Sequence, residues 1–229
     1  MMPAVADTPV QITAFAWVPD FARGQVRDLR VRWALEEAGT PYSVRKFNAA
    51  AERPADYYDE QPFGQVPSYR DDTVRMFESG AILLHIGESC DALLPTDPAG
   101  RARATTWVFA ALNSVEPMIQ QLAIIDLFHS DSAWGRERRP EVATLVRTRL
   151  GRLSDHLGMK DFLEERFTAG DLMMTTVLRI LNHTDLVAEH ANLAAYKQRC
   201  ESRPAFGRAL EAQLADFDGE APAAMPKVA

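Results

Sequence analysis

The stretch that decides the fold runs from Gln61 to Glu88 and reads QPFGQVPSYRDDTVRMFESGAILLHIGE. Within it, Gln65-Val66-Pro67 opens a predicted short strand, Val66–Tyr69. A proline fits this place because it lacks a ladder donor and is confined to strand starts and edges. Two aspartates then supply a turn, and Val74–Phe77 predicts a second strand. The stretch therefore predicts a β-hairpin.

A helix is predicted after the hairpin, over Ala81–Gly87, where apolar residues recur at helical spacing. Ser79 precedes it as the candidate N-cap, at a point where the helix dipole and unpaired N–H groups favour an anion. If the Val66–Pro67 peptide bond is cis, the N–H and C=O of Val66 are free to pair with an extended peptide. Together these features predict a socket for a small acidic peptide.

The order of strand, cis-proline, strand and a helix opened by Glu78 and Ser79 resembles the glutathione-binding half of the cytosolic glutathione S-transferase family. Gln61–Gly64 is similar to the N-P-x-G lead-in of that family. The resemblance, to a bacterial member of no assigned class, covers residues 10–214 and implies glutathione as co-substrate, without a metal. The alternative to this ligand-binding role is that the hairpin and helix only pack a hydrophobic core.

The residues before the hairpin predict the rest of an α/β domain. Val10–Val18 and Tyr42–Phe47 alternate as strands, and Gln25–Ala38 between them has helical spacing and ends at Gly39. A strand–helix–strand connection of this length implies a parallel, right-handed crossover. The fold expected for residues 1–90 is a thioredoxin-like domain.

A second, all-helical domain is predicted after a linker at residues 91–98, which is rich in proline and aspartate. Long helical patterns cover Ala99–Phe128 and Glu137–Leu157. The fold class is therefore α/β plus all-α, with a C-terminal helical-bundle substrate domain at residues 99–216. A flexible tail is expected at residues 217–229.

Two local features of this second domain are also predicted. Pro117 is expected to kink the first long helix. Thr168 and Asp171 have the spacing of an acidic capping box ahead of a buried helix, a feature that the same family shares.

The chemistry that the resemblance implies is attack of an enzyme-held glutathione thiolate on a small hydrophobic electrophile. The family places the sulfur at the start of its first helix beside a Tyr, Ser or Cys, and the window Trp17–Val26 contains none of these residues. One interpretation is that the guanidinium of Arg23, the amide of Gln25 and the helix N–H groups stabilise the thiolate electrostatically. Trp17 stands where Tyr-type members carry their phenol, and an indole N–H is only a donor.

Simpler roles for these three residues stay open. Arg23 is then a solvated surface cation, Gln25 an ordinary residue of the first helical turn, and Trp17 an aromatic residue of the core. The rival function is a glutathione-binding protein with little conjugating activity. Such a protein is an isomerase, a peroxide or disulfide reductase, or a non-catalytic binding scaffold.

The glutathione-binding residues implied by the resemblance are Gln65, Val66, Pro67, Glu78, Ser79, Lys46 and Arg53. Val66 would pair through its backbone with the cysteinyl unit, and Ser79 would hold the γ-glutamyl carboxylate. Glu78 and Gln65 would contact the charged head of that unit. Lys46 and Arg53 are candidates to bind the glycine carboxylate. The alternative is that both are solvated surface charges.

The second-substrate pocket of the family is walled by the first helix of the helical domain. The residues here that would face it are Thr105, Phe109, Leu112, Asn113 and Glu116. Apolar residues at helical spacing are also common in cores, so a packing role is the alternative.

Composition limits the partners of the chain, whose 229 residues carry a net charge of −7. Such a charge argues against nucleic acid or an anionic membrane surface as the main partner. No apolar run is expected to approach the ~20 residues that span a bilayer, and Met1–Thr8 lacks the features of a signal peptide, so cytoplasm is expected. Cys90, Cys200 and the five histidines show no metal or dithiol spacing. Family analogy implies a homodimer.

Overall fold

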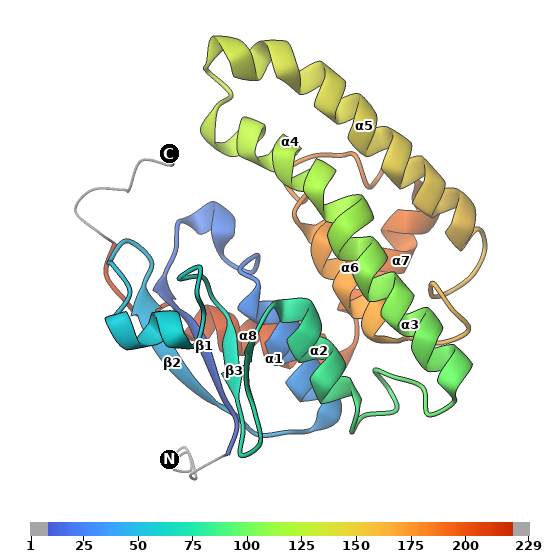
Figure 1. The fold of residues 1–229 in the computed structure, drawn as a ribbon. Coiled ribbons are helices and arrows are strands. Elements are labelled where there is room, and N and C mark those ends of the chain that lie inside the picture. The colour runs from blue at the N-terminus through green and yellow to red at the C-terminus, as the bar shows by residue number, and fades with distance from the viewer. Residues whose placement is uncertain (1–8, 222–229) are drawn as a thin grey trace. The chain divides into compact units, whose positions relative to one another are not determined.

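The structure, a computed structural model, describes residues 9–221, which form two compact units (Figure 1). The first unit contains the described residues before Asp91 together with those from Pro204 onward. The second unit contains Asp91–Arg203.

A four-stranded sheet of order β2-β1-β3-β4 is the centre of the first unit. β1 (Gln11–Trp17) runs parallel to β2 (Ser43–Asn48), which confirms the predicted parallel pairing. β3 (Ser68–Arg70) pairs antiparallel with β1 and with β4 (Arg75–Phe77). The predicted hairpin is thus present at the edge of a mixed sheet of thioredoxin-like topology. The connection before it contains a short 3-10 helix, η2 (Ala55–Asp59).

Helix α1 (Asp28–Ala38) begins three residues later than the predicted start at Gln25. The preceding residues form a 3-10 turn, η1 (Asp20–Ala22), and Gly24 has a φ of 73°, a left-handed conformation that interrupts a right-handed helix. The helix ends as predicted, at Gly39 with a φ of 64°. Figure 1 shows α1 and the next helix, α2 (Ser79–Gly87), beside the sheet.

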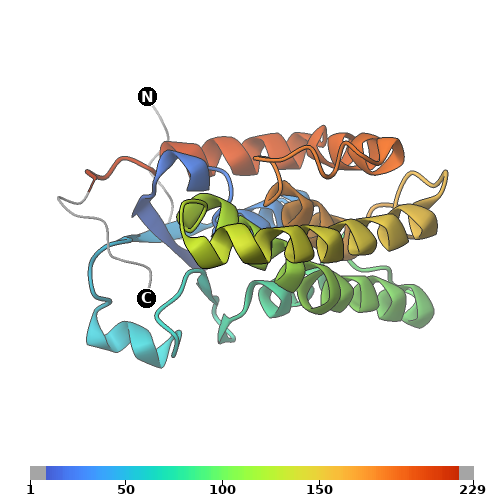
Figure 2. The same cartoon turned by 90° about the horizontal axis from the view of Figure 1, so that it is seen from above.

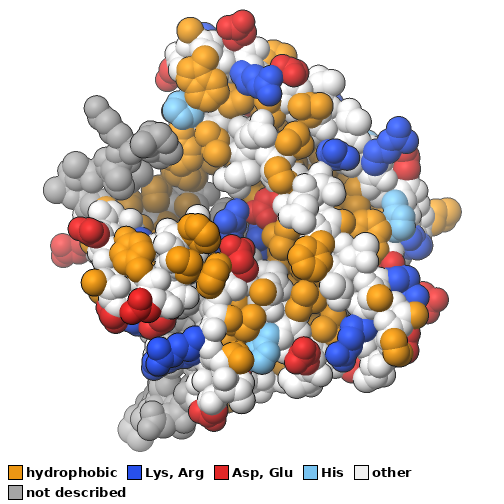
Figure 3. All heavy atoms as spheres, in the orientation of Figure 1, with side chains coloured by type: hydrophobic (Ala, Val, Ile, Leu, Met, Phe, Trp, Pro, Cys, Tyr) orange, Lys and Arg blue, Asp and Glu red, His pale blue; other side chains and the backbone are white. Residues whose placement is uncertain are grey.

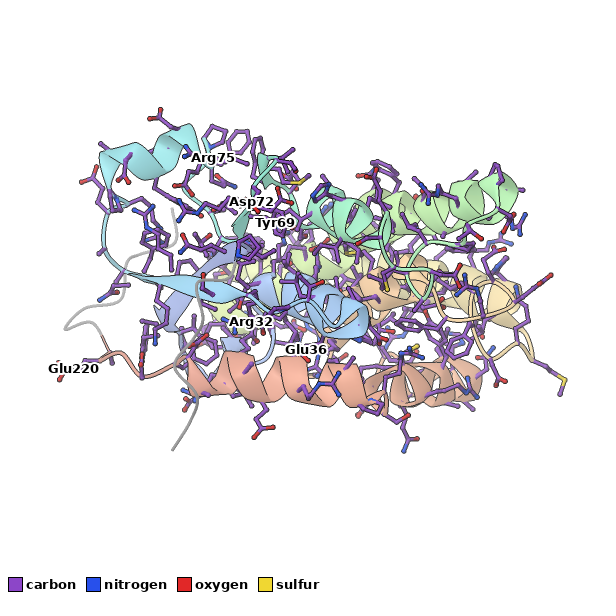
Figure 4. The ribbon with its side chains drawn as sticks, turned by 90° about the horizontal axis from the view of Figure 1, so that it is seen from below. Arg32, Glu36, Tyr69, Asp72, Arg75 and Glu220 are labelled. Atoms are coloured by element: carbon purple, nitrogen blue, oxygen red, sulfur yellow. The ribbon has the colours of Figure 1, made fainter. Side chains whose placement is uncertain are left out.

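Helix α8 (Pro204–Ala215) groups with the first unit, whereas its sequence position had placed it in the helical domain. The reason is long-range packing against α1, where the rings of Trp33 and Phe206 meet edge to face at 4.8 Å. Glu36 on α1 accepts a hydrogen bond from Arg208 Nε on α8 at 2.7 Å. Figure 4 shows Arg32 and Glu36 on the side of α1 that is next to α8.

The second unit is entirely helical. Its elements are α3 (Pro98–Ala110), the π turn η3 (Ala111–Val115), α4 (Glu116–Phe128), α5 (Ala133–Leu157), α6 (Ala169–Arg179) and α7 (Ala191–Glu201). Every residue of α6 is buried, so α6 is the core of this unit. Figures 1 and 2 show α3 to α4 as one long helix with α5 alongside it.

A π turn, η3, ends two residues before Pro117, the residue at which a kink was predicted. A proline has no N–H to give to the carbonyl four residues earlier, here that of Asn113, and its ring crowds that carbonyl. Widening the turn relieves this crowding. π turns of this kind are frequent at functional sites.

The predicted capping box is confirmed at the start of α6. The Thr168 N–H donates to Asp171 Oδ2 at 2.9 Å, and the Gly170 N–H donates to Thr168 Oγ1 at 3.2 Å. Asp171 Oδ1 also accepts from the hydroxyl of Tyr196 at 3.0 Å and from the N–H of Leu163 at 2.9 Å. This carboxylate therefore ties three segments of the second unit together.

One helical stretch within residues 9–221, Pro98–Phe128, is long and apolar enough to cross a membrane. The expectation that no apolar run approaches this length was therefore wrong. A core helix of a globular protein meets the same criterion, and this helix packs against α5 and α6, so the observation is weak evidence for a membrane span. On the face of the molecule drawn in Figure 3, hydrophobic, acidic and basic side chains are interspersed.

Candidate functional site

The Val66–Pro67 peptide bond at the start of the hairpin is cis, as expected. In the described part of the chain, the N–H and C=O of Val66 have no hydrogen-bond partner. The groups on either side are held. The carbonyl of Gln65 accepts from the Tyr57 hydroxyl at 2.6 Å, and the N–H of Ser68 donates to Thr13 Oγ1 at 2.7 Å. An unpaired peptide group thus lies between two anchored ones.

The start of α2 lies at the same end of the hairpin as this peptide group. Ser68 pairs with Phe77 across the hairpin, so Val66–Pro67 leads into β3 where Glu78 and Ser79 follow β4. The structure therefore brings together Gln65, Val66, Pro67, Glu78 and Ser79, as the sequence spacing implied. Gln65 and Glu78 are exposed, and Val66, Pro67 and Ser79 are buried.

The expected N-cap role of Ser79 was wrong. Ser79 is the first residue of α2, and Glu78 occupies the N-cap position with a φ of 70° and without a side-chain capping bond. A glutamate at positive φ is uncommon and costs free energy, which marks the site as a place where function can impose the conformation. The first-turn N–H groups of α2 are consequently left without a side-chain cap.

A buried arginine that the sequence interpretation missed contacts this helix start. Arg30 on α1 is 3% exposed, and its Nη1 donates to Ser79 Oγ at 3.3 Å. The helix dipole and this guanidinium both favour a negative charge at the start of α2. The sequence did contain a sign of this role, since Arg30 is a charged residue at a position where the apolar residues of α1 predict burial.

The two cations proposed for a glycine carboxylate both have partners inside the first unit. Lys46 Nζ lies 2.7 Å from Asp218 Oδ2 and 3.6 Å from Asp216 Oδ1. Arg53 donates to three backbone carbonyls, those of Asn48 and Ala51 at 2.7 Å and that of Gly64 at 3.2 Å. Burial lowers the pKa of Arg53. Each cation therefore already has polar partners, and these contacts are partly exposed to solvent.

The residues proposed to stabilise a thiolate lie at the end of β1 and in the turns before α1. Trp17 is the half-buried last residue of β1. Arg23 is exposed, with its guanidinium 5.1 Å from the centre of the Phe217 ring. The N–H of Gln25 donates to the carbonyl of Ala22 at 3.0 Å, so Gln25 is a turn residue.

The N-terminus of α1 contains a carboxylate of its own. Asp28, the first residue of the helix, is buried and accepts from Arg32 Nε at 2.7 Å and from Gln213 Nε2 at 2.7 Å. Burial raises the pKa of Asp28, and the hydrogen bonds from Arg32 and Gln213 oppose this shift. In its ionised form this carboxylate offsets part of the positive helix dipole that a thiolate would use.

The five residues proposed for a second-substrate pocket lie on α3, η3 and α4. Phe109 is 53% exposed and Asn113 is exposed, whereas Thr105 and Leu112 are half-buried. Glu116, the first residue of α4, is buried. Their spacing places them on neighbouring positions of one helix face, interrupted by the π turn.

The two cysteines lie in different environments. Burial raises the pKa of the Cys200 thiol to about 12, so this sulfur is protonated near neutral pH. Cys90 is half-buried, and its Sγ lies 3.7 Å from the carbonyl of Glu37. No group of three potential metal ligands occurs among the residues that the structure describes.

The sequence of the chain is similar to that of glutathione S-transferases. Residues 21–88 match the family model for the glutathione S-transferase N-terminal domain. Glutathione S-transferase F14 of Arabidopsis thaliana is 30% identical over 164 residues, 63% of this chain and 62% of that protein, so the chain spans less than two thirds of this relative. A glutathione S-transferase of Hyoscyamus muticus is 24% identical over 200 residues, 80% of this chain and 92% of that protein.

Solved structures with a similar fold come from several sources. A glutathione transferase family member from Pseudomonas fluorescens, with two glutathione bound, has a TM-score of 0.79 and 20% identity, with 91% and 95% of the two chains covered. Ure2p in complex with glutathione has a TM-score of 0.76 and 20% identity, with 89% and 93% covered. The chain therefore has the fold of the glutathione S-transferases, and its residues 21–88 match the N-terminal domain of that family.

Proposed function

We propose that the chain binds glutathione and catalyses attack of the bound thiolate on a small hydrophobic electrophile. The observation that carries this proposal is the unpaired peptide group of Val66 beside the uncapped start of α2. A peptide ligand that pairs with the first and places a carboxylate at the second satisfies both. Glutathione has this combination of groups, and relatives at the level of the family carry the name of the activity.

The γ-glutamyl end of glutathione is the best supported part of the pose. The Val66 N–H and C=O pair with the cysteinyl unit, next to Pro67. Ser79, the first N–H groups of α2 and Arg30 receive the γ-glutamyl carboxylate, since all of them favour a negative charge. The exposed side chains of Gln65 and Glu78 contact the charged amino head.

The glycine end requires a rearrangement. Lys46 and Arg53 remain the candidates for the glycine carboxylate, and each already has partners. Lys46 would exchange Asp218 for the ligand. Because an exposed ion pair contributes only about 0–1 kcal/mol, this exchange costs little.

On the thiolate side, Arg23 supplies a positive charge, Gln25 a donor amide and Trp17 an apolar wall with one N–H. None of the three accepts a proton readily, so stabilisation of the thiolate is electrostatic. The electrophile is proposed to bind along the helix face that contains Phe109 and Leu112.

The wider setting follows the same family analogy. We propose a cytoplasmic homodimer that detoxifies small electrophiles, with neither nucleic acid nor a membrane as partner and without a metal. A bacterial origin is compatible with the similar Pseudomonas fluorescens structure, and the curated relatives named above are from plants.

A second function has a specific observation in its favour. The window Trp17–Val26 lacks Tyr, Ser, Thr and Cys, and Asp28 stands at the helix end that would otherwise stabilise a thiolate. Both features support a glutathione-binding protein with little conjugating activity.

The experiment that separates these functions measures binding and turnover on the same preparation. Calorimetry should give glutathione binding at millimolar concentration or below, and a chromogenic aryl halide should be conjugated. Binding without turnover across several electrophiles selects the second function. Absence of binding refutes both.

A further inference from the structure

Two buried hydroxyl groups join the peptide group before Val66–Pro67 to the peptide group after it. Tyr57 on η2 is 0% exposed, and its hydroxyl donates to the carbonyl of Gln65 at 2.6 Å. Thr13 on β1 is 2% exposed, and its Oγ1 lies 2.8 Å from the Tyr57 hydroxyl. The N–H of Ser68 donates to the same Thr13 Oγ1 at 2.7 Å.

The donor and acceptor in each of these hydrogen bonds follow from the two backbone groups at the ends of the series. The Gln65 carbonyl can only accept, so it takes the proton of Tyr57, whose oxygen then accepts from Thr13. Thr13 Oγ1 in turn accepts from the Ser68 N–H. Thr13 Oγ1 also lies 3.2 Å from Ser68 Oγ, whose hydroxyl donates to Glu60 Oε2 at 3.3 Å, so the hydroxyls of Tyr57 and Thr13 both belong to a buried hydrogen-bond network. In a buried setting such a satisfied network holds its ends rigidly.

These hydrogen bonds occupy the Gln65 carbonyl and the Ser68 N–H. The N–H and C=O of Val66, which lies between them in the sequence, stay unpaired in the described part of the protein. We propose that Thr13 and Tyr57 are positioning residues, which hold the Val66 N–H and C=O for the backbone of a peptide ligand. This inference rests on the proposed glutathione site and extends it to two residues from different elements.

The packing around Tyr57 allows its hydroxyl to be tested alone. The Tyr57 ring belongs to a buried cluster with Phe47 and Val66, and its centre lies 4.5 Å from that of Phe47. Tyr57→Phe keeps this ring and removes one oxygen. Thr13→Val is nearly isosteric and removes the other hydroxyl, whereas Thr13→Ser restores it.

The test compares two ligands that differ in one part. Glutathione uses the Val66 peptide group through its cysteinyl unit, whereas L-glutamate has only the amino acid head that faces the start of α2. Tyr57→Phe and Thr13→Val should each weaken glutathione binding by about tenfold and change L-glutamate binding by less than about twofold. Thr13→Ser should restore wild-type affinity. Calorimetry measures glutathione, an NMR titration measures L-glutamate, and thermal melts report folding.

Two outcomes overturn the inference. Wild-type glutathione affinity in both Tyr57→Phe and Thr13→Val removes the hydroxyls from the site. Equal losses for both ligands reduce their role to general stability. If the wild type itself does not bind glutathione, the proposed function fails first, and amide hydrogen exchange at Val66 and Ser68 then tests the positioning alone. Unchanged exchange in Tyr57→Phe refutes it.

Discussion

The ammonium group of Lys46 on β2 lies 2.7 Å from the carboxylate of Asp218, which follows α8. Asp216 lies near the same ammonium and also accepts from Arg32 Nη2 at 2.6 Å. The segment after α8 is therefore held against the first unit by charge pairs. The hydrogen bonds of Asp218 and Asp216 outweigh the slight burial of Lys46 and raise its pKa, so the cation is charged at neutral pH.

Release of Lys46 from Asp218 is predicted to favour a ligand carboxylate. Asp218→Asn should tighten glutathione binding by up to about fivefold, because the exposed pair that competes with the ligand is worth about 0–1 kcal/mol. Calorimetry measures the change. In a Lys46→Met background the Asp218 substitution should have no effect, and an equal gain there would exclude Lys46 from the site.

Ser79 is predicted to hold the γ-glutamyl carboxylate. Ser79→Ala should weaken glutathione binding by about 1–3 kcal/mol, the cost of leaving a charged acceptor short of one hydrogen bond. Ser89→Ala is the matched control, since Ser89 lies beyond the other end of α2 and its hydroxyl donates to the carbonyl of Ile86. Unchanged affinity in Ser79→Ala would count against this assignment.

Arg23 is predicted to lower the pKa of the bound thiol through its charge. Arg23→Ala should raise that pKa, which ultraviolet absorbance of the thiolate against pH measures directly. Arg23→Lys keeps the charge and should retain most of the effect. A pKa that does not move in Arg23→Ala removes this residue from the mechanism.

The capping box of α6 is predicted to be structural only. Thr168→Ala removes the hydroxyl that accepts from the Gly170 N–H and should lower the free energy of unfolding by about 0.5–2 kcal/mol. Glutathione affinity should stay at the wild-type value. Chemical denaturation and calorimetry on the same variant check both statements, and a loss of affinity in the folded variant would contradict the second.

Asp71 is predicted to make the first unit sensitive to acid. Partial burial of this carboxyl opposes ionisation, but hydrogen bonds from His85, Thr73 and Val74 outweigh it and hold the pKa of Asp71 below its usual value of 3.8. A depressed pKa gives stability that is present above the unfolded-state value and is lost as pH falls toward the folded-state value. Asp71→Asn should therefore lower stability at pH 7 and flatten its decline below pH 3.8, as measured by urea unfolding at several pH values.

Sequence patterns predicted a structural feature correctly where the residues that determine it lie close together in the sequence. Pro67 predicted the start of the hairpin, Gly39 the end of α1, and Thr168 with Asp171 the capping box, because each acts on neighbouring backbone groups. The same kind of pattern misplaced the cap of α2. Ser79 has the right side chain for a cap, but its hydroxyl is engaged by Arg30 from another helix.

The sequence by itself determined the order of elements, the free peptide group at Val66 and the acidic character of the chain, since these depend on residues a few positions apart. Only the tertiary structure decided that α8 packs with the first unit, that Lys46 is paired with Asp218, and that Tyr57 and Thr13 anchor the peptides beside Val66. Lys46 and Asp218, for example, are 172 positions apart in the sequence. Their partners are chosen by the packing of whole elements, and no local pattern encodes which distant polar group will satisfy a buried or charged one.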